Sequence, residues 1–84
     1  MSNKELVIAD LSRKYDNPIA ELVQVACRYS SSMFLIRDNH RINAKSIMGI
    51  MAFNPSSGME VQIEADGADE VQAISAMENF LICR

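Results

Sequence analysis

Glycine and proline are scarce in this 84-residue sequence, which holds three of the first and two of the second. With 49% hydrophobic residues, this composition excludes a collagen-like repeat, a linker and a disordered tail. No apolar run approaches the roughly 20 residues of a membrane span, and the opening Met-Ser-Asn-Lys-Glu lacks the apolar stretch of a signal peptide. We therefore expect one cytoplasmic domain over residues 1–84.

Positive charge is also in short supply, with eight Lys and Arg against eleven Asp and Glu and a net charge of −3. A protein that binds nucleic acid through phosphate contacts needs an excess of basic residues. We therefore expect no direct contact with nucleic acid, and any effect on transcription would run through a protein partner.

Residues that bind metals are few. Cys27 and Cys83 lie far apart in the chain, and His40 is the single histidine. Since this pattern lacks the paired spacing of zinc sites, we expect no metal and no cofactor. A reducing cytosol disfavours a disulfide, so both cysteines are expected to be small buried or half-buried thiols. His40 falls at a turn, where we expect it to be solvated and without a catalytic role.

Hydrophobic periodicity predicts alternating strands and helices. The expected strands are 4–10, 33–37, 40–44 and 59–65, and the expected helices are 18–29, 47–53 and a last one from 69 onward. Buried stripes are expected at Ile19, Leu22, Val23 and Ala26 in the first helix and at Val71, Ile74, Met77 and Leu81 in the last. The order β-α-β-β-α-β-α indicates an α+β sandwich, a four-stranded antiparallel sheet covered on one face by three helices.

One segment, Asn43 to Met51, reads Asn-Ala-Lys-Ser-Ile-Met-Gly-Ile-Met. It closely resembles the regulatory-serine motif of the HPr family, the small phosphocarriers of the bacterial sugar phosphotransferase system. Pro18-Ile19-Ala20, Leu22-Val23-Gln24 and Gly67-Ala68-Asp69-Glu70 agree with that family in order and spacing. The resemblance spans nearly the whole chain and implies the HPr-like open-faced sandwich and a protein that is not an enzyme.

The sequence departs from the family at the phosphoryl-transfer site. Tyr15 stands where the family has its phosphorylated histidine, and Asn17 stands where it has an arginine. A phenol titrates near pH 10 and is a poor nucleophile, and asparagine lacks the bidentate cationic grip of arginine. We therefore expect phosphocarriage at position 15 to be lost. Asp16 or Asn17 would cap the first helix, and we hypothesise that the Asp16 carboxylate occupies the anion slot at its N-terminus.

Ser46 is the predicted N-cap of the helix 47–53. The resemblance implies that Ser46 is also the target of an HPr kinase/phosphorylase. A phosphate there adds roughly −1.5 to −2 charges at a helix N-terminus, where the helix dipole favours them. Gly49 leaves the nearby amides uncrowded, so phosphorylation should alter the charge of a surface with little effect on the fold.

The short helix 47–53 has apolar residues at 47, 48, 50, 51 and 53, which cannot all face inward. We expect Ile50 and Phe53 to lie in the core and the others to be partly exposed. Exposed apolar area that is rich in methionine is typical of adaptable interaction surfaces. The residues that match the family's partner-docking surface are Ala20, Gln24, Cys27, Ile47, Met48 and Met51.

Within the family, the chain resembles the Crh-like branch, which lacks the carrier histidine and keeps the regulatory serine. By that likeness, the expected partners are an HPr kinase/phosphorylase and a CcpA-type transcription regulator, although Asn17 replaces an arginine that contributes to regulator contacts. Two alternatives stay open. One is a phosphocarrier that uses Tyr15 or His40. The other is a structural interaction module in which Ser46 is only a cap.

Overall fold

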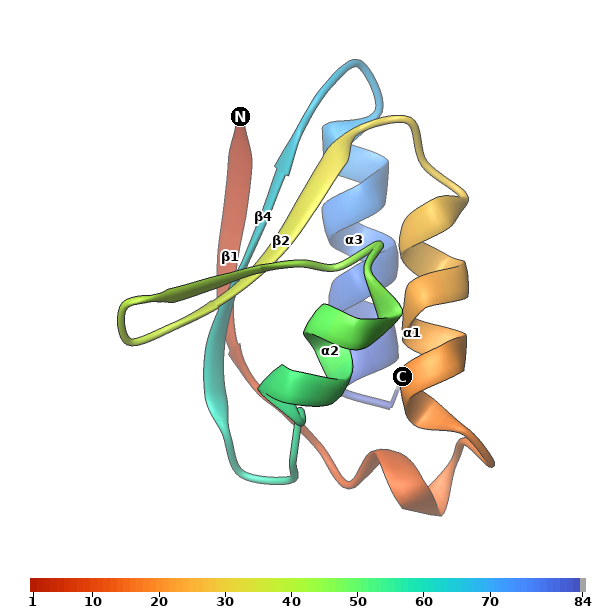
Figure 1. The fold of residues 1–84 in the computed structure, drawn as a ribbon. Coiled ribbons are helices and arrows are strands. Elements are labelled where there is room, and N and C mark those ends of the chain that lie inside the picture. Colours follow the sequence, from red (N-terminus) through yellow and green to blue (C-terminus); the bar gives the residue numbers. More distant parts are fainter. Residues whose placement is uncertain (84) are drawn as a thin grey trace.

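Alternating strands and helices form two layers in the computed structural model, which describes residues 1–83 (Figure 1). The strands are β1 (Ser2–Val7), β2 (Ser32–Arg37), β3 (His40–Asn43) and β4 (Glu60–Asp66). The helices are the short 3-10 helix η1 (Leu11–Arg13), α1 (Pro18–Cys27), α2 (Ile47–Phe53) and α3 (Glu70–Leu81). This order confirms the predicted βαββαβα arrangement.

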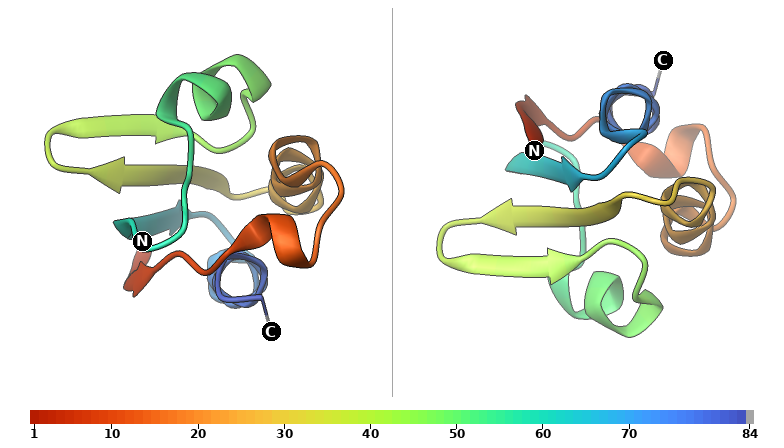
Figure 2. Two further views of the ribbon diagram at one scale, coloured as in Figure 1. Left: turned by 90° about the horizontal axis from the view of Figure 1, so that it is seen from below. Right: turned by 90° about the horizontal axis from the view of Figure 1, so that it is seen from above.

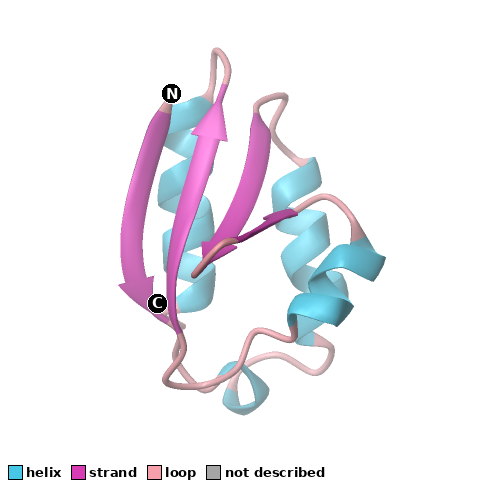
Figure 3. Cartoon of the chain, turned by 60° about the vertical axis from the view of Figure 1, so that its left-hand side comes forward, coloured by secondary structure: helices cyan, strands magenta, loops and turns pink. Residues whose placement is uncertain are grey.

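The four strands form one antiparallel sheet in the order β1-β4-β2-β3. Helix α3 packs on β1 and β4, α2 packs on β3, and α1 lies against both other helices. The end-on views of Figure 2 show α1 beside α3, with α2 next to the β2–β3 hairpin. Figure 3 shows the strands in front of α3, with no helix on their near side. The sheet is therefore covered on one face, as predicted.

Strand β4 shows why the sequence pattern predicts this layer. Val61, Ile63 and Ala65 alternate with polar residues and are at most 4% exposed. Because successive side chains of a strand point to opposite faces, this alternation places one set on the helices and the other in water. Leu22 and Ala26 of α1 are fully buried in the same core cluster as these strand residues, as their helical spacing predicts.

The predicted buried stripe of α3 is confirmed at Met77 and Leu81, and Ile74 is half-buried against the core, but the prediction is wrong for Val71. Val71 is 69% exposed, whereas Ala73, Met77, Phe80 and Leu81 are buried. The predicted and observed stripes share Met77 and Leu81 and both obey helical spacing, so periodicity cannot choose between them. Contact with β1 and β4 selects the stripe that contains Phe80.

Strand β1 also differs, since it begins at Ser2 and ends at Val7 instead of spanning 4–10. Beyond it the chain leaves the sheet, and the Ala9 N–H donates to the Leu81 carbonyl of α3 at 2.9 Å. This bond directs the following segment toward α3, where Tyr15 makes its contacts.

Candidate functional site

Ser46 caps the N-terminus of α2, as predicted. It is half-buried and extended, and its Oγ accepts a hydrogen bond from the Gly49 N–H at 3.2 Å. The Ile50 N–H donates to the Ser46 carbonyl at 3.0 Å. The second bond is the first intrahelical bond of α2, and the first satisfies one of the N–H groups that a helix start leaves without intrahelical partners. The serine hydroxyl is thus held at the first turn of a seven-residue helix.

Gly49 lets α2 approach the sheet closely. A Cβ at this position would lie 2.9 Å from Cγ2 of Ile42 on β3 and 3.4 Å from the Ser46 Oγ. A larger residue would therefore press on Ile42 and crowd the serine hydroxyl. This agrees with the expectation that glycine keeps the surroundings of Ser46 open.

Lys45 precedes the capping serine and reaches the end of α1. Its Nζ donates a hydrogen bond to the Tyr29 carbonyl at 2.7 Å, and its backbone N–H donates to Asn43 Oδ1 at 2.9 Å. The sequence places Lys45 beside Ser46, but nothing in the pattern signals the contact with Tyr29. The turn that carries Ser46 is therefore bonded directly to the segment that follows α1.

Helices α1 and α2, which pack against each other, carry the predicted docking residues, called here the α1/α2 surface. Ile47, Met48 and Met51 are 47%, 79% and 59% exposed, in a protein whose other apolar side chains are mostly buried. Gln24 is exposed and Ala20 half-buried on α1, which packs against α2. Exposed apolar area of this kind is typical of an interaction surface. The surface comprises Ala20, Gln24, Cys27, Ile47, Met48 and Met51.

Four residues test the burial expectations. Ile50 is fully buried and Phe53 half-buried against the core, as expected. Cys27 is a free, exposed cysteine, so the expectation of a buried or half-buried thiol is wrong for this residue, while Cys83 is half-buried and free. The reason is helical geometry: Cys27 follows the fully buried Ala26 by one residue, which turns its side chain about 100° away from the core.

Tyr15 lies between η1 and α1 and turns its ring onto α3. The ring stacks on Phe80 with centroids 4.1 Å apart and planes 13° apart. The hydroxyl donates a hydrogen bond to the Phe80 carbonyl at 3.2 Å. Burial raises the pKa of Tyr15, with smaller contributions from Cys83 and Glu21. The phenol is therefore fixed against α3 and is harder to ionise than an exposed tyrosine.

The N-terminus of α1 is capped by Asn17. Its Oδ1 accepts from the Ala20 N–H at 3.5 Å, and its own N–H donates to Glu21 Oε2 at 3.2 Å. The hypothesis that the Asp16 carboxylate fills this slot is corrected, because the side chain that accepts from the first-turn amide of Ala20 is that of Asn17. Asn17 is the residue that immediately precedes the helix, which is the position from which a short polar side chain reaches the first turn.

His40 begins β3 at the hairpin turn and is exposed, as predicted. Its register partner across the hairpin is Arg37. Figure 1 shows this hairpin projecting away from α1. The single histidine and Tyr15 therefore lie in separate parts of the structure, and the fold does not bring them into one site.

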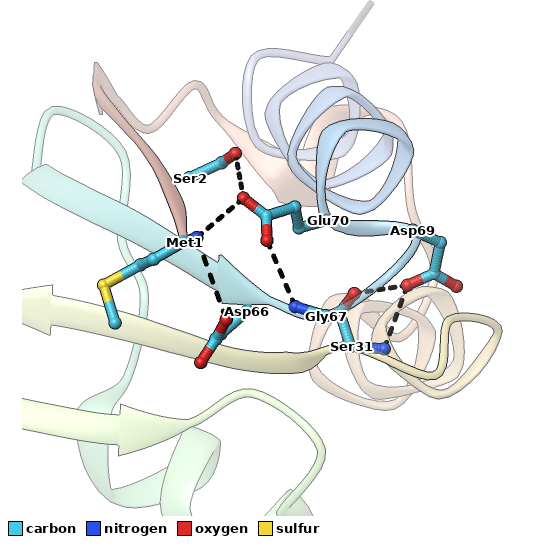
Figure 4. Close-up of polar contacts among 7 residues, drawn as sticks. All are labelled: Met1, Ser2, Ser31, Asp66, Gly67, Asp69 and Glu70. Carbon is cyan, nitrogen blue, oxygen red and sulfur yellow. Dashed lines mark hydrogen bonds and ion pairs between the residues drawn. The ribbon is translucent and has the colours of Figure 1, made fainter.

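The sequence places Asp69 and Glu70 at the start of the last helix but does not predict the contacts that their carboxylates make. Asp69 accepts from the Ser31 N–H at 3.0 Å and from the Ser31 hydroxyl (Figure 4). It also accepts from the Ser30 N–H at 2.9 Å. These bonds, the Ser31 hydroxyl first, lower the pKa of Asp69 to about 2. Gly67 is required nearby, because it has a φ of +155° and a Cβ would lie 2.8 Å from the Ser31 Cα.

Glu70 makes the second set of contacts in Figure 4. It accepts from the Ser2 hydroxyl at 2.5 Å, from the Gly67 N–H at 3.2 Å, and from the Met1 amino group at 3.0 Å. The Ser2 hydroxyl, the amino group and the Gly67 N–H lower the pKa of Glu70 to about 2. Together the two carboxylates join α3 to β1 and to the turn before β2, which is a structural role.

Within residues 1–83, every helix is too short or too polar to traverse a lipid bilayer. The family model described as "PTS HPr component phosphorylation site" matches residues 3–82. The chain belongs to the HPr family. The confirmed sandwich is therefore the HPr-like fold that the sequence resemblance implied.

Similar proteins include both phosphocarriers and Crh. The phosphocarrier protein HPr of Treponema pallidum (strain Nichols) is 49% identical over 63 residues, which cover 75% of this chain and 72% of that protein. The HPr-like protein Crh of Bacillus subtilis (strain 168) is 42% identical over 64 residues, which cover 76% and 75%. The crystal structure of HPr-C-His from Thermoanaerobacter tengcongensis has a TM-score of 0.86 at 37% identity, covering 96% of this chain and 91% of that one.

Proposed function

We propose that this HPr-family protein is a regulatory member of the phosphotransferase system that is switched by phosphorylation of Ser46 and does not carry a phosphoryl group at position 15. The observation that supports this most directly is the placement of Tyr15. Its ring is stacked on Phe80 and its hydroxyl donates to the Phe80 carbonyl. With tyrosine in place of the carrier histidine and with Ser46 retained, the chain resembles the Crh branch of the family.

A carrier must accept and release a phosphoryl group, and Tyr15 suits neither step. Attack on phosphorus by the phenol requires loss of its proton, which the raised pKa of Tyr15 disfavours at neutral pH. The resulting tyrosine phosphate would be a stable ester. Asn17, which caps α1, supplies no positive charge for the transferring group.

Ser46 is better suited than Tyr15 to accept a phosphoryl group, as the target of a protein kinase. In the proposed reaction the Ser46 Oγ attacks the γ-phosphorus of ATP, the bond to the β,γ-bridging oxygen breaks, and the hydroxyl proton passes to the base of the kinase. The phosphate brings negative charge next to Ile47 and Met48, which are exposed. The proposed partners of the α1/α2 surface are an HPr kinase/phosphorylase and a CcpA-type transcription regulator.

Incubation with purified HPr kinase and ATP, followed by mass spectrometry, tests the proposal. We expect one phosphate per chain, located on Ser46. The control variant is Ser46→Asn, because asparagine is a good N-cap and keeps α2 folded while it removes the hydroxyl. An unmodified wild-type chain would overturn the proposal and favour the interaction module in which Ser46 is only a cap.

A second assay tests the carrier alternative. The chain is incubated with the phosphoryl-donating enzyme of the phosphotransferase system and labelled phosphoenolpyruvate. We expect no label to be retained on the chain. Acid-labile label that disappears in His40→Gln, or acid-stable label that disappears in Tyr15→Phe, would show that the protein is a carrier after all.

A further inference from the structure

Lys45 connects the segment next to Ser46 with the end of α1. Its Nζ lies 2.7 Å from the Tyr29 carbonyl oxygen in a partly buried hydrogen bond. Its backbone N–H donates to Asn43 Oδ1, which holds the turn before α2. Within residues 1–83, no carboxylate forms an ion pair with Lys45. The ammonium is therefore bonded to a neutral acceptor and retains its capacity to pair with an anion.

The Tyr29 carbonyl belongs to the frayed end of α1. The helix ends at Cys27, and beyond it the N–H groups of Arg28 and Tyr29 donate to Val25 and Ala26 at 3.2 and 3.4 Å. A helix C-terminus carries partial negative charge, which a nearby cation stabilises. The Lys45 ammonium therefore supports the turn that contains Cys27, one of the residues of the α1/α2 surface.

We propose that phosphorylation of Ser46 draws the Lys45 ammonium from the Tyr29 carbonyl to the phosphate and so loosens the last turn of α1. This inference rests on the proposed modification of Ser46. The Tyr29 carbonyl is a neutral acceptor, whereas a phosphate would add direct attraction between opposite charges to the hydrogen bond of the Lys45 ammonium. The flexible four-carbon stem of lysine allows its ammonium to move between the two acceptors. The modification then changes the mobility of the docking surface near Cys27 in addition to its charge.

The test uses full-length chains in which phosphoserine is incorporated at position 46 during translation, so that no kinase is needed. Each phosphorylated chain is compared with its unmodified form in the wild type, Lys45→Gln, Lys45→Arg and Lys14→Gln. Lys14→Gln removes the same charge from a residue beside Tyr15, at the other end of α1. The readouts are the phosphate pKa, followed by phosphorus NMR, and the exchange rates of the Arg28 and Tyr29 amide protons.

We expect the phosphoserine pKa in the wild type to lie about half a unit below that in Lys45→Gln, the size of a partly exposed ion pair. Lys45→Arg should restore the lower value, and Lys14→Gln should leave it unchanged. Phosphorylation should speed exchange of the two amides several-fold in the wild type. In Lys45→Gln, exchange should already be fast without phosphate and should not change further.

Equal phosphate pKa values in the wild type and Lys45→Gln would overturn the inference, as would amide exchange that phosphorylation leaves unchanged in the wild type. A phosphate pKa that rises as much in Lys14→Gln as in Lys45→Gln would reduce the effect to net charge and overturn the inference too. Because phosphoserine is built in, these outcomes do not depend on whether a kinase recognises the chain, which the kinase assay alone decides.

Discussion

The contact between Tyr15 and Phe80 should contribute measurably to stability. Tyr15→Phe removes the hydroxyl bond to the Phe80 carbonyl, which still accepts from the Cys83 N–H at 3.2 Å. Since no buried acceptor loses its last partner, the expected cost is near the low end of the range for one hydrogen bond, about 0.5 to 1 kcal/mol.

Tyr15→Ala should cost more, because it also removes a ring stacked with centroids 4.1 Å apart. The stack adds about 0.5 to 1.5 kcal/mol, and loss of a half-buried side chain adds a similar amount. The expected total is about 2 to 3 kcal/mol. For a domain of this size, each kcal/mol lowers Tm by about 4 to 8 °C.

Urea unfolding followed by circular dichroism measures both changes as shifts in the midpoint at constant slope. Tyr29→Phe is the matched control, because among the described residues the Tyr29 hydroxyl has no hydrogen-bond partner. We expect its midpoint to stay near that of the wild type. If Tyr15→Ala unfolded at the same urea concentration as the wild type, position 15 would not hold this segment to α3, and the structural reading of Tyr15 would be refuted.

Three further predictions concern the helix starts. Ser46→Ala removes the cap of α2 and should lower the free energy of unfolding by about 1 kcal/mol, whereas Ser46→Asn should leave it nearly unchanged. Equal losses in the two variants, measured by urea unfolding, would contradict a capping role for Ser46. In the same assay, Asn17→Ala should lower the free energy of unfolding by about 1 kcal/mol and Asp16→Ala by less than about 0.5 kcal/mol. A larger loss in Asp16→Ala would show that the Asp16 carboxylate caps α1. Asp69 and Glu70 have ordinary pKa values of 3.8 and 4.5 that folding lowers to about 2, so each binds fewer protons in the folded chain. The stability that these two carboxylates contribute should be complete above pH 4.5 and lost as pH falls toward 2. The double variant Asp69→Asn, Glu70→Gln should therefore show a smaller decrease of the urea midpoint over this pH range than the wild type. An equal decrease in both proteins would contradict the prediction.

The elements that could be predicted are those whose signal is local. The alternation in β4 and the spacing of Leu22 and Ala26 in α1 report burial directly. Ser46 could be recognised as a cap because a serine before an apolar helical segment bonds amides only three residues away. The exposure of Met48 and Met51 followed from the excess of apolar residues over the buried positions of a short helix.

The errors arose where local patterns allow two solutions or where a polar bond is long-range. Either stripe of α3 satisfies helical spacing, and only the packing against β1 and β4 exposes Val71. Two adjacent polar residues could each have capped α1, and the backbone at Asn17 decides between them. The bonds of Asp69 to Ser30 and Ser31 join residues almost forty positions apart, so no local pattern marks them.

The sequence by itself determined the scarcity of positive charge and glycine, the order of strands and helices, and the presence of tyrosine at position 15 and serine at position 46. These properties depend on residue identity and on periods of two or 3.6, which neighbouring residues express. Tertiary structure alone placed Tyr15 on Phe80 and the Lys45 ammonium on the Tyr29 carbonyl. Such contacts form only when packing of the core brings distant segments within hydrogen-bonding distance, and in this protein they explain why position 15 is held against α3 and how Ser46 adjoins α1.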